Sequence, residues 1–129
     1  MFDGLSVAMV TPFLGGEIDL DATAGLIDFM IEGGVQNLVI SGSTGEAATC
    51  SIEERRRLWT FARAQVRGRV PLLAGTGTNS TSESIALTGM AEELGLDGAM
   101  IVTPYYNQPT PRGQIAHFTA VARSTRLPL

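Results

Sequence analysis

The chain has 129 residues, of which 44% are hydrophobic and 17% are charged, and its formal net charge at pH 7 is −4. These values are typical of a globular protein with one core and argue against a fibrous or disordered chain. All nine basic residues are arginine; they form no basic patch of the kind that binds nucleic acid, and no apolar run approaches the roughly 18 residues of a membrane span.

Four short apolar segments, each bounded by glycine, proline or polar residues, have the length of β-strands. They are too short for helices, and their nearly continuous hydrophobicity predicts strands buried on both faces, as in a parallel sheet. The predicted strands are residues 6–10, 37–40, 70–74 and 99–102.

A helical pattern follows each predicted strand, and local signals mark the ends of the helices. The first should begin near Asp19 and stop at Gly33-Gly34. The second and third open with capping boxes, in which a serine and a glutamate three residues later satisfy each other's backbone amides, and the fourth opens with threonine followed by proline. These pairs are Ser51 with Glu54, Ser80 with Glu83 and Thr110 with Pro111, and the apolar stripe expected on the third helix is Ala86, Met90 and Leu94.

The strand–helix unit repeats about every 30 residues, which predicts a parallel α/β fold in one domain, residues 1–129. Four units fit either a small doubly wound sheet or half of an eight-stranded barrel. Residues 127–129 should begin a fifth strand, so we expect the domain to be incomplete. Bare strand edges should make such a fragment marginal, oligomeric or aggregation-prone by itself.

In parallel α/β folds, functional residues gather in the loops after the carboxyl ends of the strands. The turn Gly42-Ser43-Thr44-Gly45-Glu46 offers adjacent hydroxyls and backbone N–H groups to a carboxylate or phosphate, although a tight turn with internally satisfied hydroxyls is an equal alternative. Gly75-Thr76-Gly77 lacks the third glycine of a dinucleotide loop, since Ser80 stands in its place. Tyr105 and Tyr106 suit either proton relay or interface packing.

Other reactive side chains fit structural roles. A single cysteine, Cys50, excludes an internal disulfide, is expected to be a small buried filler and favours a cytoplasmic location. His117 has no cluster of potential metal ligands around it and is expected on a partly buried helix face. Arg55-Arg56-Arg57 is expected to lie on a solvated helix face rather than in an anion site.

Two of the loops resemble signatures of the dihydrodipicolinate synthase family. Gly42-Ser43-Thr44-Gly45-Glu46 is similar to its GTTGE motif, and Thr103-Pro104-Tyr105-Tyr106-Asn107-Gln108-Pro109 is similar to its TPYYN-x-P motif. The opening Val7-Ala8-Met9-Val10-Thr11-Pro12 and the segment Ala74-Gly75-Thr76-Gly77 also look like the family. The resemblance covers the whole chain in the family's order.

The resemblance implies the N-terminal half of a (β/α)8 TIM barrel, with about four parallel βα units plus the start of strand 5. It implies a lyase that condenses pyruvate with aspartate semialdehyde through a lysine Schiff base, giving 4-hydroxy-tetrahydrodipicolinate for lysine and diaminopimelate biosynthesis. No metal or organic cofactor is implied. The implied full-length form is a homo-oligomer, a dimer or tetramer.

The family's site residues carry over to four positions. Thr44 would hold the pyruvate carboxylate with its hydroxyl and backbone N–H. Ser43 stands where the family usually has threonine, so its hydroxyl would serve both in the proton relay and in substrate binding. Tyr106 would be the relay phenol that reaches a neighbouring subunit's site, and Tyr105 would lie at the same interface.

Three departures from the family pattern leave alternatives open. The Schiff-base lysine, the second relay tyrosine and the substrate-binding arginine fall beyond Leu129, so this chain alone is expected to be inactive. The GSTGE spelling also looks like N-acetylneuraminate lyase and keto-deoxy-sugar aldolases, and a non-catalytic anion-binding α/β fragment is a further alternative. Strong lysine feedback is not expected: Asn79, Glu83 and Tyr105 match the family's lysine-binding pattern, but Ala47, Ile52 and Arg55 do not.

Overall fold

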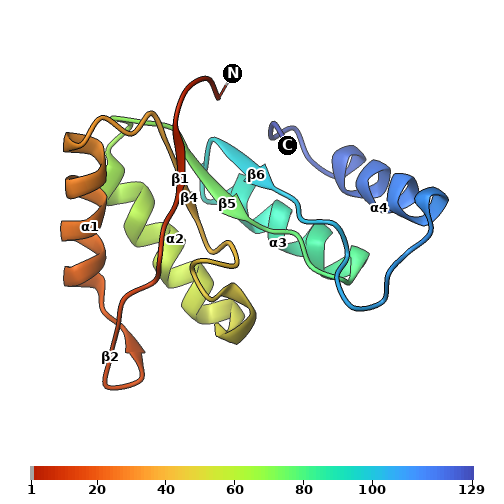
Figure 1. Cartoon of the computed structure of the whole chain (residues 1–129), viewed down its shortest axis with the longest axis horizontal. Helices are drawn as coiled ribbons and strands as arrows, with labels where there is room; N and C mark the ends of the chain where they lie inside the picture. The colour runs from red at the N-terminus through yellow and green to blue at the C-terminus, as the bar shows by residue number, and fades with distance from the viewer. Residues whose placement is uncertain (1) are drawn as a thin grey trace.

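A four-stranded parallel sheet organises residues 2–129, the part of the chain that the computed structural model describes (Figure 1). Its strands lie side by side in chain order, and each pairs with the next in parallel. They are β1 (Ser6–Ala8), β4 (Asn37–Ile40), β5 (Leu72–Gly75) and β6 (Gly98–Met100).

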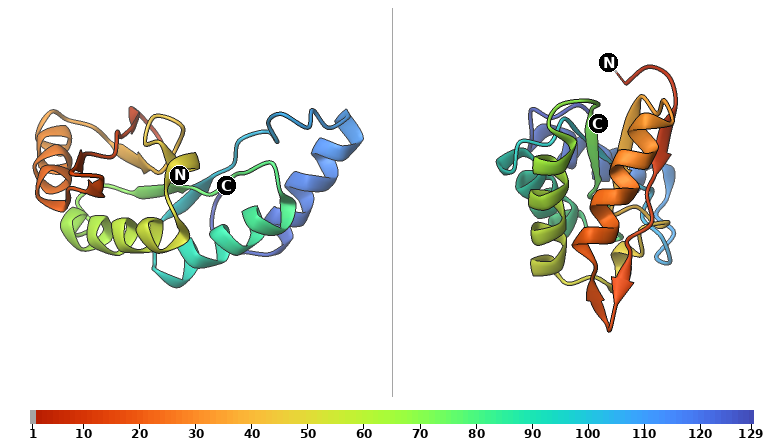
Figure 2. Two further views of the ribbon diagram at one scale, coloured as in Figure 1. Left: turned by 90° about the horizontal axis from the view of Figure 1, so that it is seen from below. Right: turned by 90° about the vertical axis from the view of Figure 1, so that its left-hand side faces the viewer.

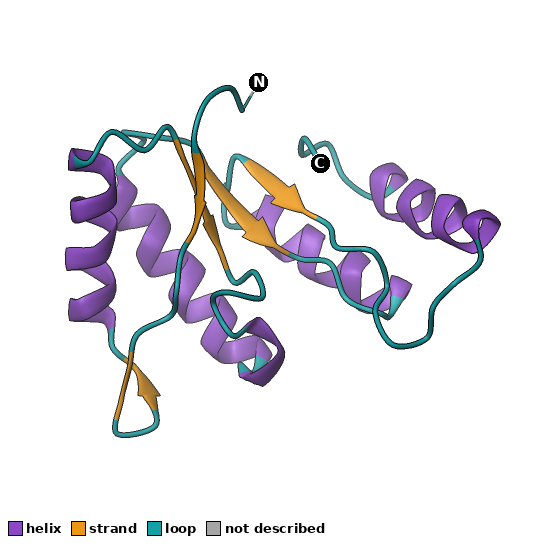
Figure 3. Ribbon diagram, in the orientation of Figure 1, coloured by secondary structure: helices purple, strands orange, loops and turns teal. Residues whose placement is uncertain are grey.

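Four α-helices follow the strands and lie along one side of the curved sheet (Figures 2 and 3). They are α1 (Leu20–Glu32), α2 (Ile52–Val66), α3 (Thr81–Glu93) and α4 (Pro111–Arg123), and a short 3-10 helix, η1 (Ala47–Thr49), precedes α2. A doubly wound sheet would reverse its strand order and carry helices on both faces. This arrangement does neither, so of the two predicted architectures the half-barrel is confirmed.

The predicted helix starts are confirmed by hydrogen bonds at the caps. The side chain of Asp19 accepts from the N–H of Ala22, and Ser51 and Glu54 form both halves of a capping box. Ser80 accepts from the N–H of Glu83 at 3.3 Å, but the N–H of Ser80 donates to the hydroxyl of Thr78 at 3.0 Å instead of to Glu83. Only half of the second predicted capping box therefore forms.

Burial follows position in the sheet more closely than the sequence pattern predicted. Strands β4 and β5 are buried throughout, as expected for central strands. Strand β1 is mostly exposed and Met100 at the end of β6 is 39% exposed, because both strands are edges and none of the helices in residues 2–129 covers the inner face of the sheet. The prediction of burial on both faces was wrong for these two strands.

The buried face of α3 is rotated relative to the predicted stripe. Ala86 is exposed, although it was expected to face the core. The residues that α3 buries are Ser84, Leu87, Thr88, Met90 and Ala91. Two buried hydroxyl groups explain the difference, because Thr88 hydrogen-bonds Thr76 at 2.8 Å and the hydroxyl of Ser84 accepts from the N–H of Thr78 at 2.8 Å.

A two-stranded hairpin that the sequence analysis did not predict follows β1. Strand β2 (Phe13–Leu14) pairs antiparallel with β3 (Glu17–Ile18) across Gly15-Gly16, both of which have positive φ, as a tight hairpin turn requires. The hairpin projects from the fold and brings the buried Ile18 back to the core beside the start of α1 (Figure 1).

The last residues run beside β6 without forming a strand of their own. The N–H of Ala99 donates to the carbonyl of Pro128 at 3.0 Å, which is one rung of the ladder that the expected fifth strand would make. Residues 127–129 are not a β-strand in this structure.

The core lies between the sheet and the helices. Its fully buried side chains include Ile27 of α1, Leu38 of β4, Trp59 of α2 and Leu72 of β5. Within residues 2–129, no helix is long and apolar enough to cross a lipid bilayer.

The capping box of α2 generates a test of helix stability. Ser51→Ala should lower the free energy of unfolding by about 1 kcal/mol at neutral pH, because it removes an N-cap hydrogen bond. Hydrogen bonds from the Ser51 backbone N–H and hydroxyl lower the pKa of the Glu54 carboxyl. A carboxyl with a lowered folded-state pKa stabilises the fold above its ordinary pKa of about 4.3, and this contribution is lost as the pH falls through the folded-state value.

Urea unfolding of both chains between neutral and acidic pH measures this effect. The difference in the free energy of unfolding between the wild type and Ser51→Ala should become smaller as the pH falls. The control is Ser6→Ala, on the exposed edge strand β1, which should unfold like the wild type at every pH. A difference in the free energy of unfolding that grows as the pH falls would contradict the role assigned to the Ser51–Glu54 capping box.

Candidate active site

Hydrogen bonds link neighbouring loops at the carboxyl end of the sheet in two pairs, one after β1 and β4 and the other after β5 and β6. The hydroxyl of Thr11, after β1, donates to the carbonyl of Gly45, after β4, at 2.7 Å. The N–H of Thr76, after β5, donates to the carbonyl of Met100, at the end of β6, at 3.1 Å. The side-chain amide of Asn107 donates to the carbonyl of Asn79 at 3.1 Å. The predicted gathering of these loops at one edge of the sheet is therefore confirmed.

Two glycines, one at the end of β5 and one just after it, allow the backbones of neighbouring loops to approach closely. A Cβ atom at Gly75 would lie 2.2 Å from the carbonyl oxygen of Ser41, and one at Gly77 would lie 2.3 Å from the backbone nitrogen of Val102. No side chain fits at either distance, so glycine is required at both positions. The Gly75-Thr76-Gly77 segment is thus explained by packing.

Ser41 sets the direction in which the chain leaves β4. It has a left-handed φ of 54°, and its buried hydroxyl accepts a hydrogen bond of 2.8 Å from the indole N–H of Trp59 on α2. Trp59 is fully buried, so this hydrogen bond is shielded from water. It holds the start of the Gly42–Glu46 turn against α2.

Ser43 and Thr44 stand in this turn with unused hydrogen-bond donors. Both residues are exposed, and among residues 2–129 neither their backbone N–H groups nor their hydroxyls have a hydrogen-bond partner. The turn is closed by other groups, namely the N–H groups of Gly45 and Ala47, which both donate to the carbonyl of Gly42. The alternative of a turn with internally satisfied hydroxyls is therefore wrong.

A cavity of about 460 Å³ opens beside the turn. Of the residues predicted for the site, Ser43 and Tyr105 line it, whereas Thr44 and Tyr106 do not. Its remaining walls come from Ser41, Gly42, the segment 46–49, Arg55, the loop after β5, and residues 100–102. This volume is within the range of small-molecule sites.

The two tyrosines differ in their surroundings. Tyr106 is 92% exposed and has a left-handed φ of 67°, whereas Tyr105 is 48% exposed and reaches the cavity wall. Neither phenol has a hydrogen-bond partner among the described residues, so both are free to meet another molecule.

Arg55 is the site residue that the sequence analysis missed. It was expected on a solvated helix face, but it is only 7% exposed, lines the cavity and donates a hydrogen bond from Nη2 to the carbonyl of Ala47. Its neighbours behave as predicted, since Arg56 pairs with Glu93 at 3.2 Å on the surface and Arg57 is exposed. The correction arises because η1 folds over the first turn of α2, which three consecutive arginines could not reveal.

The remaining singled-out residues lie in the core. The thiol of Cys50 is buried against the carbonyl of Glu46 at 3.6 Å. His117 is more buried than predicted, at 4% exposure, and its Nδ1 hydrogen-bonds the hydroxyl of Thr81 at 2.9 Å. Within residues 2–129, no three His, Cys, Asp or Glu side chains are grouped so that they could hold a metal ion.

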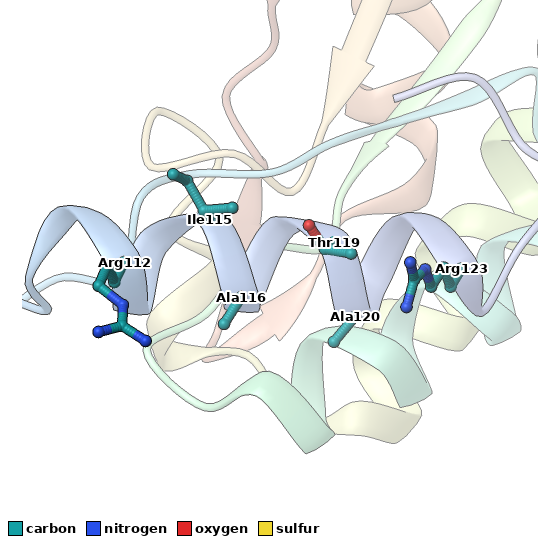
Figure 4. A pocket seen from close by; sticks show the side chains of 6 residues that line it. All are labelled: Arg112, Ile115, Ala116, Thr119, Ala120 and Arg123. Carbon is teal, nitrogen blue, oxygen red and sulfur yellow. The ribbon is translucent and has the colours of Figure 1, made fainter.

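A second hollow, of about 440 Å³, lies on the outer face of α4, away from the four loops (Figure 4). Its lining comes from a single helix, with the small residues Ala116 and Ala120 between Arg112 and Arg123. The cavity beside the Gly42–Glu46 turn adjoins the unpaired donors of Ser43 and Thr44, so it is the candidate active site.

Together, the fold and the site define half of a parallel (β/α)8 barrel with a turn of unpaired hydrogen-bond donors at the carboxyl end of its strands. The whole chain, residues 1–129, matches the Dihydrodipicolinate synthetase family and belongs to it.

Sequence relatives and solved structures agree with this family. The 4-hydroxy-tetrahydrodipicolinate synthase of Alkaliphilus oremlandii is 49% identical over 129 residues, which are 100% of this chain and 44% of the relative. The dihydrodipicolinate synthase structure from Bacillus anthracis superposes with a TM-score of 0.97 at 44% identity, over 99% of this chain and 44% of that one. A chloride-inhibited dihydrodipicolinate synthase from Acinetobacter baumannii, solved with pyruvate, has a TM-score of 0.97 at 43% identity and matches 100% of this chain and 45% of that one. The chain thus spans less than half the length of these relatives.

The buried thiol offers a test of the packing around η1. Burial raises the pKa of Cys50, and the Glu54 carboxylate raises it further, so little thiolate forms at neutral pH. Iodoacetamide should modify the native chain at least about tenfold more slowly than the chain unfolded in urea. Mass spectrometry measures both rates of modification. Equal rates for the native and the unfolded chain would mean that η1 does not cover the thiol.

Proposed function

We propose that this chain is the N-terminal part of a 4-hydroxy-tetrahydrodipicolinate synthase. The whole protein would be a cytoplasmic lyase that condenses pyruvate with aspartate semialdehyde through a lysine Schiff base. The synthase names of the relatives support this choice over N-acetylneuraminate lyase or a keto-deoxy-sugar aldolase. No lysine occurs in these 129 residues, so the imine-forming amine would come from another part of the protein.

One observation carries the proposal: the turn after β4 presents four unpaired donors. The backbone N–H groups and hydroxyls of Ser43 and Thr44 have no partner among residues 2–129. A carboxylate accepts several hydrogen bonds and prefers such an array, because charge-assisted hydrogen bonds are stronger than neutral ones. The pyruvate complex of the Acinetobacter baumannii relative supports pyruvate as the ligand.

In this proposal the turn orients the substrate for chemistry performed elsewhere. Thr44 holds the carboxylate of pyruvate with its hydroxyl and N–H. Ser43, which lines the cavity, contributes a second hydroxyl to substrate binding and to proton relay. With the carboxylate fixed, the C2 carbonyl is presented to an incoming amine in one orientation.

The exposed tyrosines extend the proposal to an assembly. Tyr106, with its free and almost fully exposed phenol, would relay protons in a neighbouring subunit's site, and Tyr105 would lie at the same interface. The whole protein would be a dimer or tetramer, although one solved dihydrodipicolinate synthase is described as a monomeric variant.

Titration of the 129-residue chain with pyruvate, monitored by the NMR chemical shifts of the backbone amides, tests the carboxylate site. The resonances of Ser43 and Thr44 should move saturably, and Thr44→Ala should weaken binding about tenfold through loss of one charge-assisted hydrogen bond. Thr119→Ala, on the exposed face of α4, should bind like the wild type. If the resonances of Ser43 and Thr44 do not shift in a folded wild-type chain, the proposal is wrong.

Borohydride reduction in the presence of pyruvate tests whether the imine-forming amine lies outside these 129 residues. Because the sequence contains no lysine, peptide mapping should find no side-chain adduct on this chain. Any label should be confined to a trace at the α-amino group. An adduct on an internal peptide would mean that the imine forms by a different route.

A further inference from the structure

Two buried side-chain hydrogen bonds bracket the Gly42–Glu46 turn. At its entrance, the indole N–H of Trp59 donates to the hydroxyl of Ser41 at 2.8 Å. At its far end, the hydroxyl of Thr11 donates to the carbonyl of Gly45 at 2.7 Å. Hydrogen bonds inside the turn fix its shape, but only contacts with neighbouring elements fix its orientation on the sheet. These contacts therefore determine where the unpaired donors of the turn point.

Ser41 occupies a position that glycine would adopt with less strain. Its φ of 54° is left-handed, which is unfavourable for a residue with a Cβ atom and persists only where the surroundings enforce it. A glycine would relieve that strain, but it would also remove the acceptor for the indole N–H of Trp59. Serine thus provides a hydrogen bond that glycine could not, in spite of the strained backbone.

The backbone of Ser41 is closely packed on both sides. A Cβ atom at Gly75 would lie 2.2 Å from the carbonyl oxygen of Ser41, and one at Gly45 would lie 3.2 Å from its backbone nitrogen. With the backbone packed this closely, Ser41 could relieve its strain only if the chain left β4 in a different direction. Such a change would move the turn that follows.

The hydrogen bond is equally necessary for Trp59. Its side chain is fully buried on α2, and the indole N–H can only donate. Its hydrogen-bond partner among residues 2–129 is Ser41. A buried donor that loses its acceptor is strongly unfavourable, because water cannot take the place of the lost partner. The helix and the start of the turn are therefore held together by a contact that both residues need.

We propose that Ser41 and Trp59 are positioning residues for the carboxylate-binding turn. The hydrogen bond between them sets the orientation of the donors of Ser43 and Thr44, and hence the affinity of the turn for pyruvate. This inference rests on the proposed function, because it assigns the pair a role in the binding that the turn performs. Trp59 acts through Ser41, and neither side chain has to touch the substrate.

Three substitutions separate positioning from folding stability. Trp59→Phe keeps an aromatic ring in the core but removes the N–H donor. Ser41→Gly removes the acceptor and relieves the backbone strain, whereas Ser41→Ala removes the acceptor and keeps the strain. Ser41→Gly should therefore resist urea better than Ser41→Ala. All three should bind pyruvate about tenfold more weakly than the wild type, because misplaced donors hold a carboxylate less well.

The matched control is Val66→Ala, which removes buried apolar contacts from the end of α2, far along the helix from the turn. It should lower the resistance to urea but leave the affinity for pyruvate unchanged. Trp59 is the only tryptophan, so its indole N–H gives a single NMR cross-peak. That cross-peak should shift saturably with pyruvate in the wild type, and Ser41→Gly should lose most of the shift.

Pyruvate titrations monitored at the amides of the turn decide between the outcomes. The double variant of Ser41→Gly with Trp59→Phe should bind no more weakly than either single variant, because both remove the same hydrogen bond. Losses of affinity that add would overturn the proposal.

Folded single variants that bind pyruvate as tightly as the wild type would also overturn the positioning role, but they would leave the proposed function intact. A folded wild-type chain whose turn does not respond to pyruvate would overturn both. Ser41→Gly, which relieves strain, decides the question even if Trp59→Phe does not fold.

Discussion

The buried hydrogen bond between Trp59 and Ser41 fixes the geometry on which the candidate site depends. Ser41 has a left-handed backbone, which costs a non-glycine residue on the order of 1 kcal/mol, so its conformation needs support from its surroundings. The indole N–H supplies that support inside the core, and Gly75 leaves room for the Ser41 carbonyl. The direction of the following turn, and hence the position of Ser43, results from these two contacts.

Local signals in the sequence predicted the elements well. Each helix start was marked by a residue whose side chain caps it, and the bounds of β4 were predicted to the residue, because short buried strands between polar residues leave few alternatives. The hairpin of β2 and β3 was missed although Gly15-Gly16, a glycine pair between Phe13-Leu14 and Glu17-Ile18, is a hairpin signal. Its strands are only two residues long, too short for an alternation pattern.

Burial was less predictable, because it depends on contacts between distant segments. The face of α3 that meets the sheet is set partly by hydroxyl pairs such as Thr76 with Thr88, which an apolar stripe does not register. Likewise, Arg55 is buried by η1, a segment whose fold depends on the turn before it. The sequence predicted which loops would meet at the site, but not that Thr44 and Tyr106 lie outside the cavity wall while Arg55 lies within it.

The attachment of α2 to both ends of the turn has a thermodynamic consequence. Trp59 holds the residue before the turn, and Arg55 holds the 3-10 helix after it through the Ala47 carbonyl. The loop is therefore clamped to a fifteen-residue helix at two points one helical turn apart. A segment restrained in this way has little configurational entropy left to lose, so if it binds the proposed carboxylate, more of the interaction energy is available as affinity.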